Sequence, residues 1–173
     1  MRLGNGSSTA TVTDDNGNNW VRVDRRSDTG GGSGDDLELW YALNASASPN
    51  AQPTLTIHSS LSASIRAVVA EFAGIQASAA LDQHATAIGT SAASSVTTSG
   101  PLAQANELVL GYGEVENMST FTAASGYTMV NIVPTGSGAK LGLEYLVSPT
   151  ASTQTAAFSL ASQAWAMGIA TYR

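Results

Sequence analysis

The sequence predicts an all-β fold, a two-sheet antiparallel β-sandwich of jelly-roll type, and three observations lead to this prediction. Short segments of alternating apolar and polar residues recur along the chain, separated by turn-forming residues. Helical periodicity is weak because Gly, Ser and β-branched residues interrupt it, so we expect at most a short helical turn near residues 78–87. The strand pattern of the first half also returns in the second half. About ten short strands between turns are typical of a sandwich.

The internal repeat relates residues of about 11–73 to residues of about 120–173. Three pairs of segments carry it: Thr11–Val23 with Thr120–Ile132, Gly32–Tyr41 with Gly136–Tyr145, and Ala70–Phe72 with Ala170–Tyr172. The spacing between partners falls from 109 to 104 to 100 residues, so we expect the loops to differ in length while the strands persist. The chain has 173 residues and no linker-like stretch, which favours a single domain over residues 1–173.

The first predicted strands, Ala10–Thr13 and Trp20–Val23, flank an Asn-Gly turn and are expected to form a hairpin, since both turn residues tolerate positive φ. The next strand, residues 37–43, places Leu37, Leu39, Tyr41 and Leu43 on its core face and Glu38 and Trp40 on the other. Further strands are expected at 54–58, 65–72, 95–98, 107–113, 141–147, 155–160 and 165–172. Segments 65–72 and 165–172 are apolar at both parities, which suggests central strands covered on both faces.

The repeat also predicts that one strand of the first half is incomplete. In the second half, Asn106–Gly111 forms a strong strand before the Thr120 segment, and only Met1, Arg2 and Leu3 could represent its counterpart. Either the first half is one strand short or these residues are a stub of that strand. A stub would leave N–H and C=O groups of a neighbouring strand exposed, and a partner chain or an upstream segment could fill the gap by strand addition. Simple divergence of the first half is the alternative.

Composition excludes several classes of function. The absence of cysteine excludes disulfides and thiolate metal sites, and 13 acidic against 7 basic side chains make nucleic acid an unexpected partner. Arg22, Arg25 and Arg26 form a basic cluster that Asp24 and Asp28 interrupt, a pattern typical of a solvated loop. No apolar run reaches the about 18 residues of a membrane span, and the first residues lack the apolar stretch of a secretory signal peptide. We therefore expect a chain without a membrane span.

Five stretches resemble a widespread β-sandwich module of secreted bacterial proteins and phage virion proteins. They are Val12–Trp20, Leu37–Ala42, Val68–Ile75, Leu81–Asp82 and Asn106–Val109, and the resemblance runs from about Thr11 to Arg173. It implies a β-sandwich of jelly-roll type on a virion or extracellular surface, and it supplies no catalytic residues. Members carry an apolar strand before the hairpin, which this chain lacks, in agreement with the internal repeat.

Catalytic patterns are weak throughout the chain. Residues 30–34 lack the spacing of a nucleophile elbow, and His58 and His84 have no evident partner. Residues 135–140 resemble a phosphate loop only superficially, because no helix follows them. A glycosidase needs two carboxylates across a cleft, and Glu38 and Glu144 could face the same solvent from the outward faces of repeat-related strands. Aromatic residues that could bind sugars total only 6%, so solvated carboxylates are expected for these two and for the rest of the pool: Glu71, Glu107, Glu114 and Glu116. The sequence therefore predicts a protein that is not an enzyme.

A structural calcium ion is the best metal candidate. Carboxylate and amide oxygens, which calcium selects, cluster in two turns: Asp14, Asp15, Asn16 and Asn18 in one, Asp35 and Asp36 in the other. The same residue types also favour tight turns, because their side chains bond to the nearby backbone. The alternative to a calcium site is therefore an ordinary pair of turns without a cofactor.

Trp40 is the most informative single side chain. It is predicted to lie opposite the core face beside Glu38, where a loop, a neighbouring subunit or a sugar could cover it. With Glu144, these residues are our candidate ligand or subunit contacts. The sequence thus predicts a non-catalytic structural or adhesive module, on a virion surface (decoration or tail) or in a bacterial extracellular assembly. A homo-oligomer or another structural protein is the expected partner, with strand addition at the N-terminal edge, and a carbohydrate-binding module is the alternative.

Overall fold

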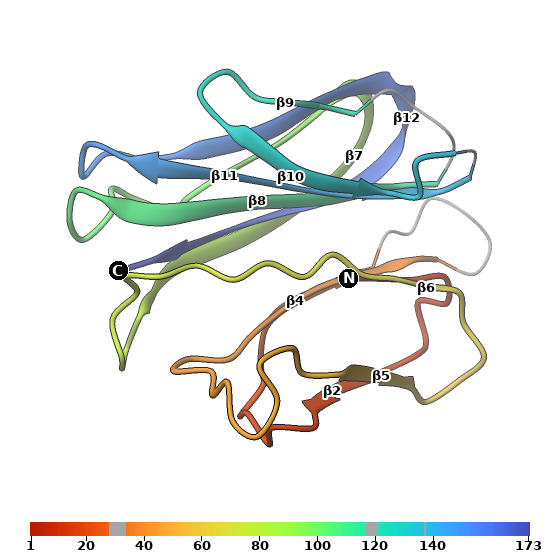
Figure 1. Ribbon diagram of the computed structural model, residues 1–173. Helices are drawn as coiled ribbons and strands as arrows, with labels where there is room; N and C mark the ends of the chain where they lie inside the picture. Colours follow the sequence, from red (N-terminus) through yellow and green to blue (C-terminus); the bar gives the residue numbers. More distant parts are fainter. Residues whose placement is uncertain (28–33, 117–120, 137) are drawn as a thin grey trace.

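The computed structural model describes residues 1–27, 34–116, 121–136 and 138–173, and these residues form an all-β structure without helix (Figure 1). No helix in this described part of the chain is long and apolar enough to cross a membrane. The strands are β1 (Arg2–Leu3), β2 (Ala10–Asp14), β3 (Val21–Ser27), β4 (Asp36–Tyr41), β5 (Leu55–Ser59), β6 (Ile65–Arg66), β7 (Leu81–Thr97), β8 (Glu107–Val115), β9 (Thr122–Ala123), β10 (Thr128–Val133), β11 (Lys140–Ser148) and β12 (Thr155–Tyr172).

The strands pair antiparallel in three sheets that lie in layers. The large sheet has the order β10-β11-β8-β12-β7, and β9 pairs with β12 beside it. The small sheet has the order β3-β4-β1-β6, and β2 and β5 form a separate two-stranded ribbon. Figure 1 shows the large sheet on one side of the molecule and the small sheet and the ribbon on the other. This arrangement confirms the prediction of an antiparallel β-sandwich, whereas the jelly-roll connectivity stays a prediction.

Two apolar clusters hold these layers together. One lies between the large and small sheets and includes Leu37 of β4 together with Leu108 and Leu110 of β8. The other lies on the far side of the large sheet, around Phe158 and Val109. Successive residues of β8 therefore point into different clusters, and every residue of this strand is buried.

Several predicted elements differ from the observed ones. Strands β2 and β3 do not form a hairpin, because β2 pairs with β5 and β3 pairs with β4, although Gly17 makes the expected turn at φ 71°. The predicted helical turn at 78–87 lies largely in β7. Segments 155–160 and 165–172 belong to one long strand, β12, with a shift of register between Ser159 and Gln163. The predicted core face of β4 is confirmed for Leu37, Leu39, Tyr41 and Leu43.

The first half also lacks most of the strand predicted at residues 65–72, since β6 contains only two residues. The matching part of β12 is a strand over its whole length and is buried from Trp165 to Tyr172. Parts of the internal repeat fall on residues 28–33, 117–120 and 137, which lie outside the described residues. Asp28 of the predicted basic loop is one of them. Arg22, Arg25 and Arg26 themselves belong to strand β3, so the expectation of a loop was wrong for them, although Arg22 and Arg25 are exposed to solvent as predicted.

Candidate functional site

A groove of about 750 Å³ begins at Met1, just before β1, and runs along β4. One bank is β4 with the loop that follows it, and the other bank is the chain after β6. The ribbon closes one side and the large sheet closes the other. Representative lining residues from these four parts are Val12, Trp40, Leu43, Val68, Leu110 and Tyr172. The groove is therefore a largely apolar space between the layers of the sandwich.

Trp40 lines this groove and is only partly buried. Its indole Nε1 donates a hydrogen bond of 2.6 Å to Oε2 of Glu38, two residues earlier on the same face of β4. The guanidinium carbon of Arg22, on β3, lies 5.7 Å from the Trp40 ring centroid, within the range of a cation–π contact. The predicted face of Trp40 is correct, and this face forms one wall of the groove.

Glu38 is fully buried, so the expectation of a solvated carboxylate was wrong. Burial raises the pKa of Glu38, and the hydrogen bond from Trp40 and the charges of Arg22 and Arg25 act in the opposite direction. Arg22 Nη1 lies 3.7 Å and Arg25 Nε 3.8 Å from Oε1 of Glu38. The carboxylate thus fixes Trp40 on one side and two arginines of β3 on the other. Its bonds give it a positioning role at the groove.

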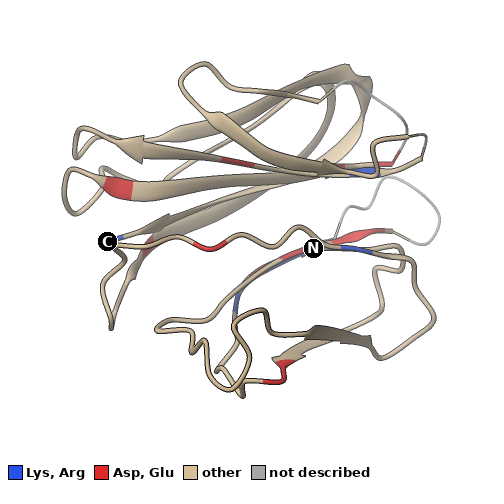
Figure 2. Ribbon diagram, viewed as in Figure 1, with Lys and Arg blue, Asp and Glu red and all other residues tan. Residues whose placement is uncertain are grey.

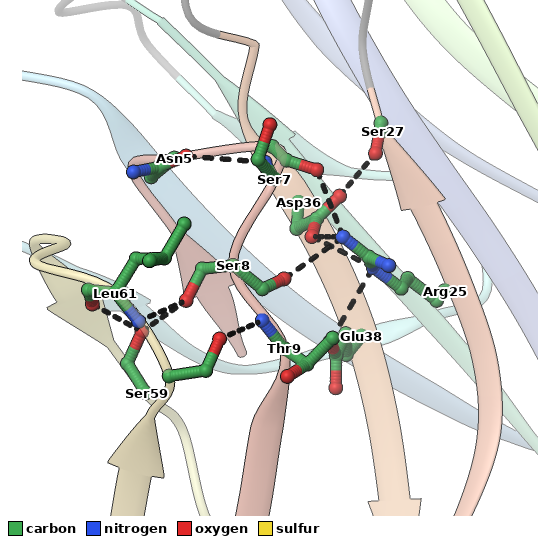
Figure 3. Close-up of polar contacts among 12 residues, drawn as sticks. Asn5, Ser7, Ser8, Thr9, Arg25, Ser27, Asp36, Glu38, Ser59 and Leu61 are labelled. Atoms are coloured by element: carbon green, nitrogen blue, oxygen red, sulfur yellow. Dashed lines mark hydrogen bonds and ion pairs between the residues drawn. The ribbon is translucent and has the colours of Figure 1, made fainter.

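Charged residues around the N-terminus tie the small sheet to its neighbours, and Figure 2 shows acidic and basic residues side by side there. Arg25 Nε donates to Oδ2 of Asp36 at 2.7 Å, and its Nη2 donates to the carbonyls of Gly6 and Ser8 at 2.8 Å each (Figure 3). Ser27 donates to the same carboxylate. This network fastens the segment between β1 and β2 to the β3–β4 pair.

Arg2 forms a second set of ion pairs, which joins the small sheet to the large sheet. Its guanidinium pairs with Asp35 and lies 3.3 Å, through Nε, from Oε2 of Glu114 in β8. Arg2 and Glu114 are almost completely buried. Two of the four acidic residues predicted as calcium ligands, Asp35 and Asp36, therefore bind arginines of the protein itself.

The other predicted calcium ligands bond within their own turn and to one loop. Asp14 accepts hydrogen bonds from the backbone of Asn16 and Asn18 and from the side chains of Asn18 and Trp20, the last at 2.7 Å. Desolvation opposes their effect, but these bonds lower the pKa of Asp14 to about 2. Asp15 accepts from the backbone of Thr54.

Asn16 and Asn18 fasten the same turn to the loop after β4. Asn16 Nδ2 donates to the carbonyls of Ser46 and Asn50 at 2.7 Å each, and Asn18 Oδ1 accepts from the Ser46 backbone at the same distance. Within the described ranges, no group of three or more His, Cys, Asp or Glu side chains is arranged to hold a metal ion. The acidic turn residues thus act as hydrogen-bond acceptors that shape one end of the groove.

Glu144 lies in the large sheet and is also fully buried, which again contradicts the predicted solvated face. Its two carboxylate oxygens accept hydrogen bonds from the backbone of Ala124 at 2.9 Å and of Ala157 at 3.1 Å. Burial raises the pKa of Glu144 to about 7, against the opposing effect of these bonds. Glu38 and Glu144 thus have different partners in different sheets, and each bonds to donors of the protein.

Sequence reasoning placed some residues wrongly and missed others. Glu107 and Glu114 were expected in solvent but are fully buried in β8. The buried ion pairs of Arg2 and the groove-lining role of Val68 and Phe72 were missed. The signal that could have identified the groove was the incomplete strand of the first half, because its neighbours on both sides keep their apolar pattern.

Comparison with known proteins found no matching family model, no matching curated protein and no matching solved structure.

Proposed function

We propose that this chain is a non-catalytic structural or adhesive β-sandwich module that holds a neighbouring protein of its assembly in the groove beside Trp40. A phage virion surface or a bacterial extracellular assembly is the setting we favour, on the composition and the strand patterns of the sequence. The groove carries the proposal. It is about 750 Å³ in volume and is lined mainly by apolar side chains from the layers around it.

The bonding of the acidic residues supports a passive role. Glu38 bonds to Trp40, Glu144 bonds to two backbone amides, and Asp36 bonds to Arg25. Each of these carboxylates is engaged by a donor of the protein and contributes to holding a side chain or a loop in place. Apolar contact with a protein partner is the chemistry that the groove then offers.

A carbohydrate-binding module is the second candidate, and one observation favours it. Trp20, Trp40 and Tyr41 line the groove together with the polar side chains of Asn18 and Asn44. Aromatic faces beside hydrogen-bonding side chains are suited to the apolar and polar parts of a sugar ring. This candidate requires at least one of these aromatic rings to contact the sugar.

Binding to a peptide array and to an oligosaccharide panel distinguishes the two candidates. We expect the wild-type chain to retain peptides, and we expect Leu43→Asp, which places a charge in the groove, to lose them. Val147→Asp is the matched control, because Val147 is 52% exposed on β11 and lies outside the groove. Sugar-dependent quenching of tryptophan fluorescence that Trp40→Phe removes would instead establish the carbohydrate module and contradict our proposal.

A further inference from the structure

The groove occupies a place that is filled in the other half of the molecule. The order β3-β4-β1-β6 of the small sheet matches the order β10-β11-β8-β12 of the large sheet. Arg2 pairs with Leu37 and Arg66, and Glu114 pairs with Leu141 and Ala166. The repeat relates Leu37 to Leu141 and Arg66 to Ala166, so β1 stands where the end of β8 stands. Strand β8 continues over residues 107–112, and the groove takes the place of these six residues.

Backbone groups along the groove are arranged for one more strand. Met1 N donates to the carbonyl of Glu38 at 2.6 Å, and Glu38 N donates to the carbonyl of Met1 at 2.9 Å. Alternate residues of an antiparallel strand bond to the same side, so the N–H and C=O of Trp40 point toward the groove. On the other bank, residues 67–72 make no backbone hydrogen bond to another described residue. A strand between these banks would find partners on both edges.

The side walls also suit a strand with two buried faces. Toward the large sheet the groove presents Leu110, Leu143 and Tyr172, and toward the ribbon it presents Val12 and Ile57. Strand β8, in the equivalent place, is buried at every residue. An added strand would therefore bury apolar side chains on both faces, as β8 does.

We propose that the groove binds an extended segment of a partner protein as an added strand of five residues, antiparallel to β4, whose last residue lies opposite Trp40. The place of Tyr112 stays free of the partner, because Met1 stands where Gly113 stands and the residue before it would have to be covalently joined to Met1. This inference rests on the proposed function, because it names the partner chemistry of the same groove. Apolar side chains at alternate positions of the segment would face the large sheet, as Leu108 and Leu110 do in β8.

The position opposite Trp40 requires a small residue. In the large sheet the equivalent pair is Gly111 and Glu144, and a Cβ added to Gly111 would lie 2.7 Å from Oε1 of Glu144. Trp40 is larger than Glu144 and lines the groove at the equivalent place in β4. Glycine at this position of the partner segment is therefore a specificity requirement.

A separate partner fits this groove better than a second copy of the chain. The best-matching segment of a copy, residues 107–112, is buried in the middle of its own sheet. Reversible strand addition by a partner requires the chain to keep its fold without the added segment.

The first experiment titrates the wild-type chain with the acetylated and amidated pentapeptide Glu-Leu-Val-Leu-Gly, the sequence of residues 107–111. We expect saturable binding by calorimetry, slower amide exchange at Trp40 and residues 67–72, and at least about tenfold weaker binding to Leu43→Asp. Val147→Asp, the counterpart of Leu43 in the repeat, should bind as the wild type does. Circular dichroism of both variants checks that they are folded. Absence of binding to the wild type would overturn the proposal.

The second experiment tests the register by changing the size of the side chain at Trp40 and at the peptide position opposite it. The peptide variant Gly111→Val is expected to bind the wild-type chain at least about tenfold more weakly, and the protein variant Trp40→Ala should restore its binding. Equal binding of the two peptides to the wild type would show a different register and would overturn the assignment. If array peptides bind in a Leu43-dependent manner while the pentapeptide does not, this inference fails and the proposed function stands.

Two further outcomes would identify another occupant. A concentration-dependent dimer of the chain alone, detected by light scattering and lost in Leu43→Asp, would assign the groove to a second copy. Protection of residues 67–72 only when the sequence of residues 107–112 is fused ahead of Met1, and not with the free pentapeptide, would assign the groove to a segment in cis. Either result would overturn the proposal of a strand from a separate partner.

Discussion

The two halves of the molecule differ most in the strand at the centre of each sheet. In the large sheet, β8 has nine residues between β11 and β12, and in the small sheet, β1 has two residues between β4 and β6. The segment Ala166–Tyr172 beside β8 is a buried strand, whereas the related segment 67–72 beside the groove is not a strand. The comparison teaches that an apolar segment becomes a strand here only where a neighbour supplies its hydrogen bonds.

The largest loss of stability is expected when the ion pairs of Arg2, which join the two halves, are removed. Arg2→Met removes the guanidinium that pairs with Asp35 and Glu114 and leaves their buried carboxylates without this cation. We expect the free energy of unfolding at pH 7 to fall by about 3–5 kcal/mol, as measured by urea denaturation. The double variant Arg2→Met/Glu114→Gln should recover part of this loss. A double variant that is as unstable as the sum of the single ones would contradict a direct interaction.

A matched pair of truncations compares the two related segments directly. Ile169 is completely buried, and its counterpart in the repeat, Val69, is 60% exposed on the bank of the groove. We expect Ile169→Ala to lower the free energy of unfolding by about 2–5 kcal/mol, because it leaves a cavity in the core. Val69→Ala should change it by less than about 0.5 kcal/mol. Similar losses for both variants would show that segment 67–72 is packed as tightly as its counterpart.

Much of the fold was predictable because strand periodicity is a local property. The alternation of Leu37, Leu39 and Tyr41 identifies the core face of β4, and the short spacing of strands identifies the all-β class. The predicted hairpin was wrong because an Asn-Gly turn reverses the chain without deciding which strands pair, and β2 and β3 enter different sheets.

The site was harder to predict because it depends on layers that meet only in three dimensions. Trp40 was placed on the correct face, but alternation could not reveal that the ribbon and the large sheet enclose the space beside it. Glu38 and Glu144 were expected in solvent because an alternating pattern marks one face as polar. A polar face is also compatible with burial when arginines or backbone amides supply the bonds, as they do here.

The pH dependence of stability should reveal the contribution of the Glu144 carboxyl group. Its pKa is about 7 in the folded chain against a usual 4.5, so between these values the folded chain keeps a proton that the unfolded chain loses. The stabilisation from this group is therefore complete below about pH 4.5 and is lost as the pH rises through about 7. We expect Glu144→Gln to flatten this decline by on the order of 2 kcal/mol in urea denaturation from pH 4.5 to 8.

The control for this measurement is Glu71→Gln, the same change of residue type at an exposed position. Glu38 and Glu107 have raised pKa values through burial and contribute a decline of the same sign. The difference in the slope of stability against pH between wild type and Glu144→Gln therefore gives the contribution of Glu144 alone. An unchanged slope in Glu144→Gln would contradict a carboxyl group that stays protonated near neutral pH.

The smallest effect is expected in the turn of the first half, where Asp14 bonds to Asn16, Asn18 and Trp20. Asp14→Ala should lower Tm by less than Ile169→Ala does, because it removes hydrogen bonds at a partly exposed turn. The bonds lower the pKa of Asp14 to about 2, so their stabilisation is present above about pH 4 and is lost as the pH falls through about 2. Thermal melts of both chains at pH 7 and pH 2 should therefore converge at the lower pH.

The variant Asp14→Ala also tests the predicted calcium site. The related turn of the second half has Ala123 and Ala124 at the positions of Asp14 and Asp15, so it lacks these carboxylates. We expect the wild-type Tm to be the same with a chelator and with added calcium, because the Asp14 oxygens already accept bonds from N–H donors. A rise of Tm in calcium that Asp14→Ala abolishes would show that the ion displaces these donors. The acidic turn would then bind metal in one half while the alanine turn of the other half does not.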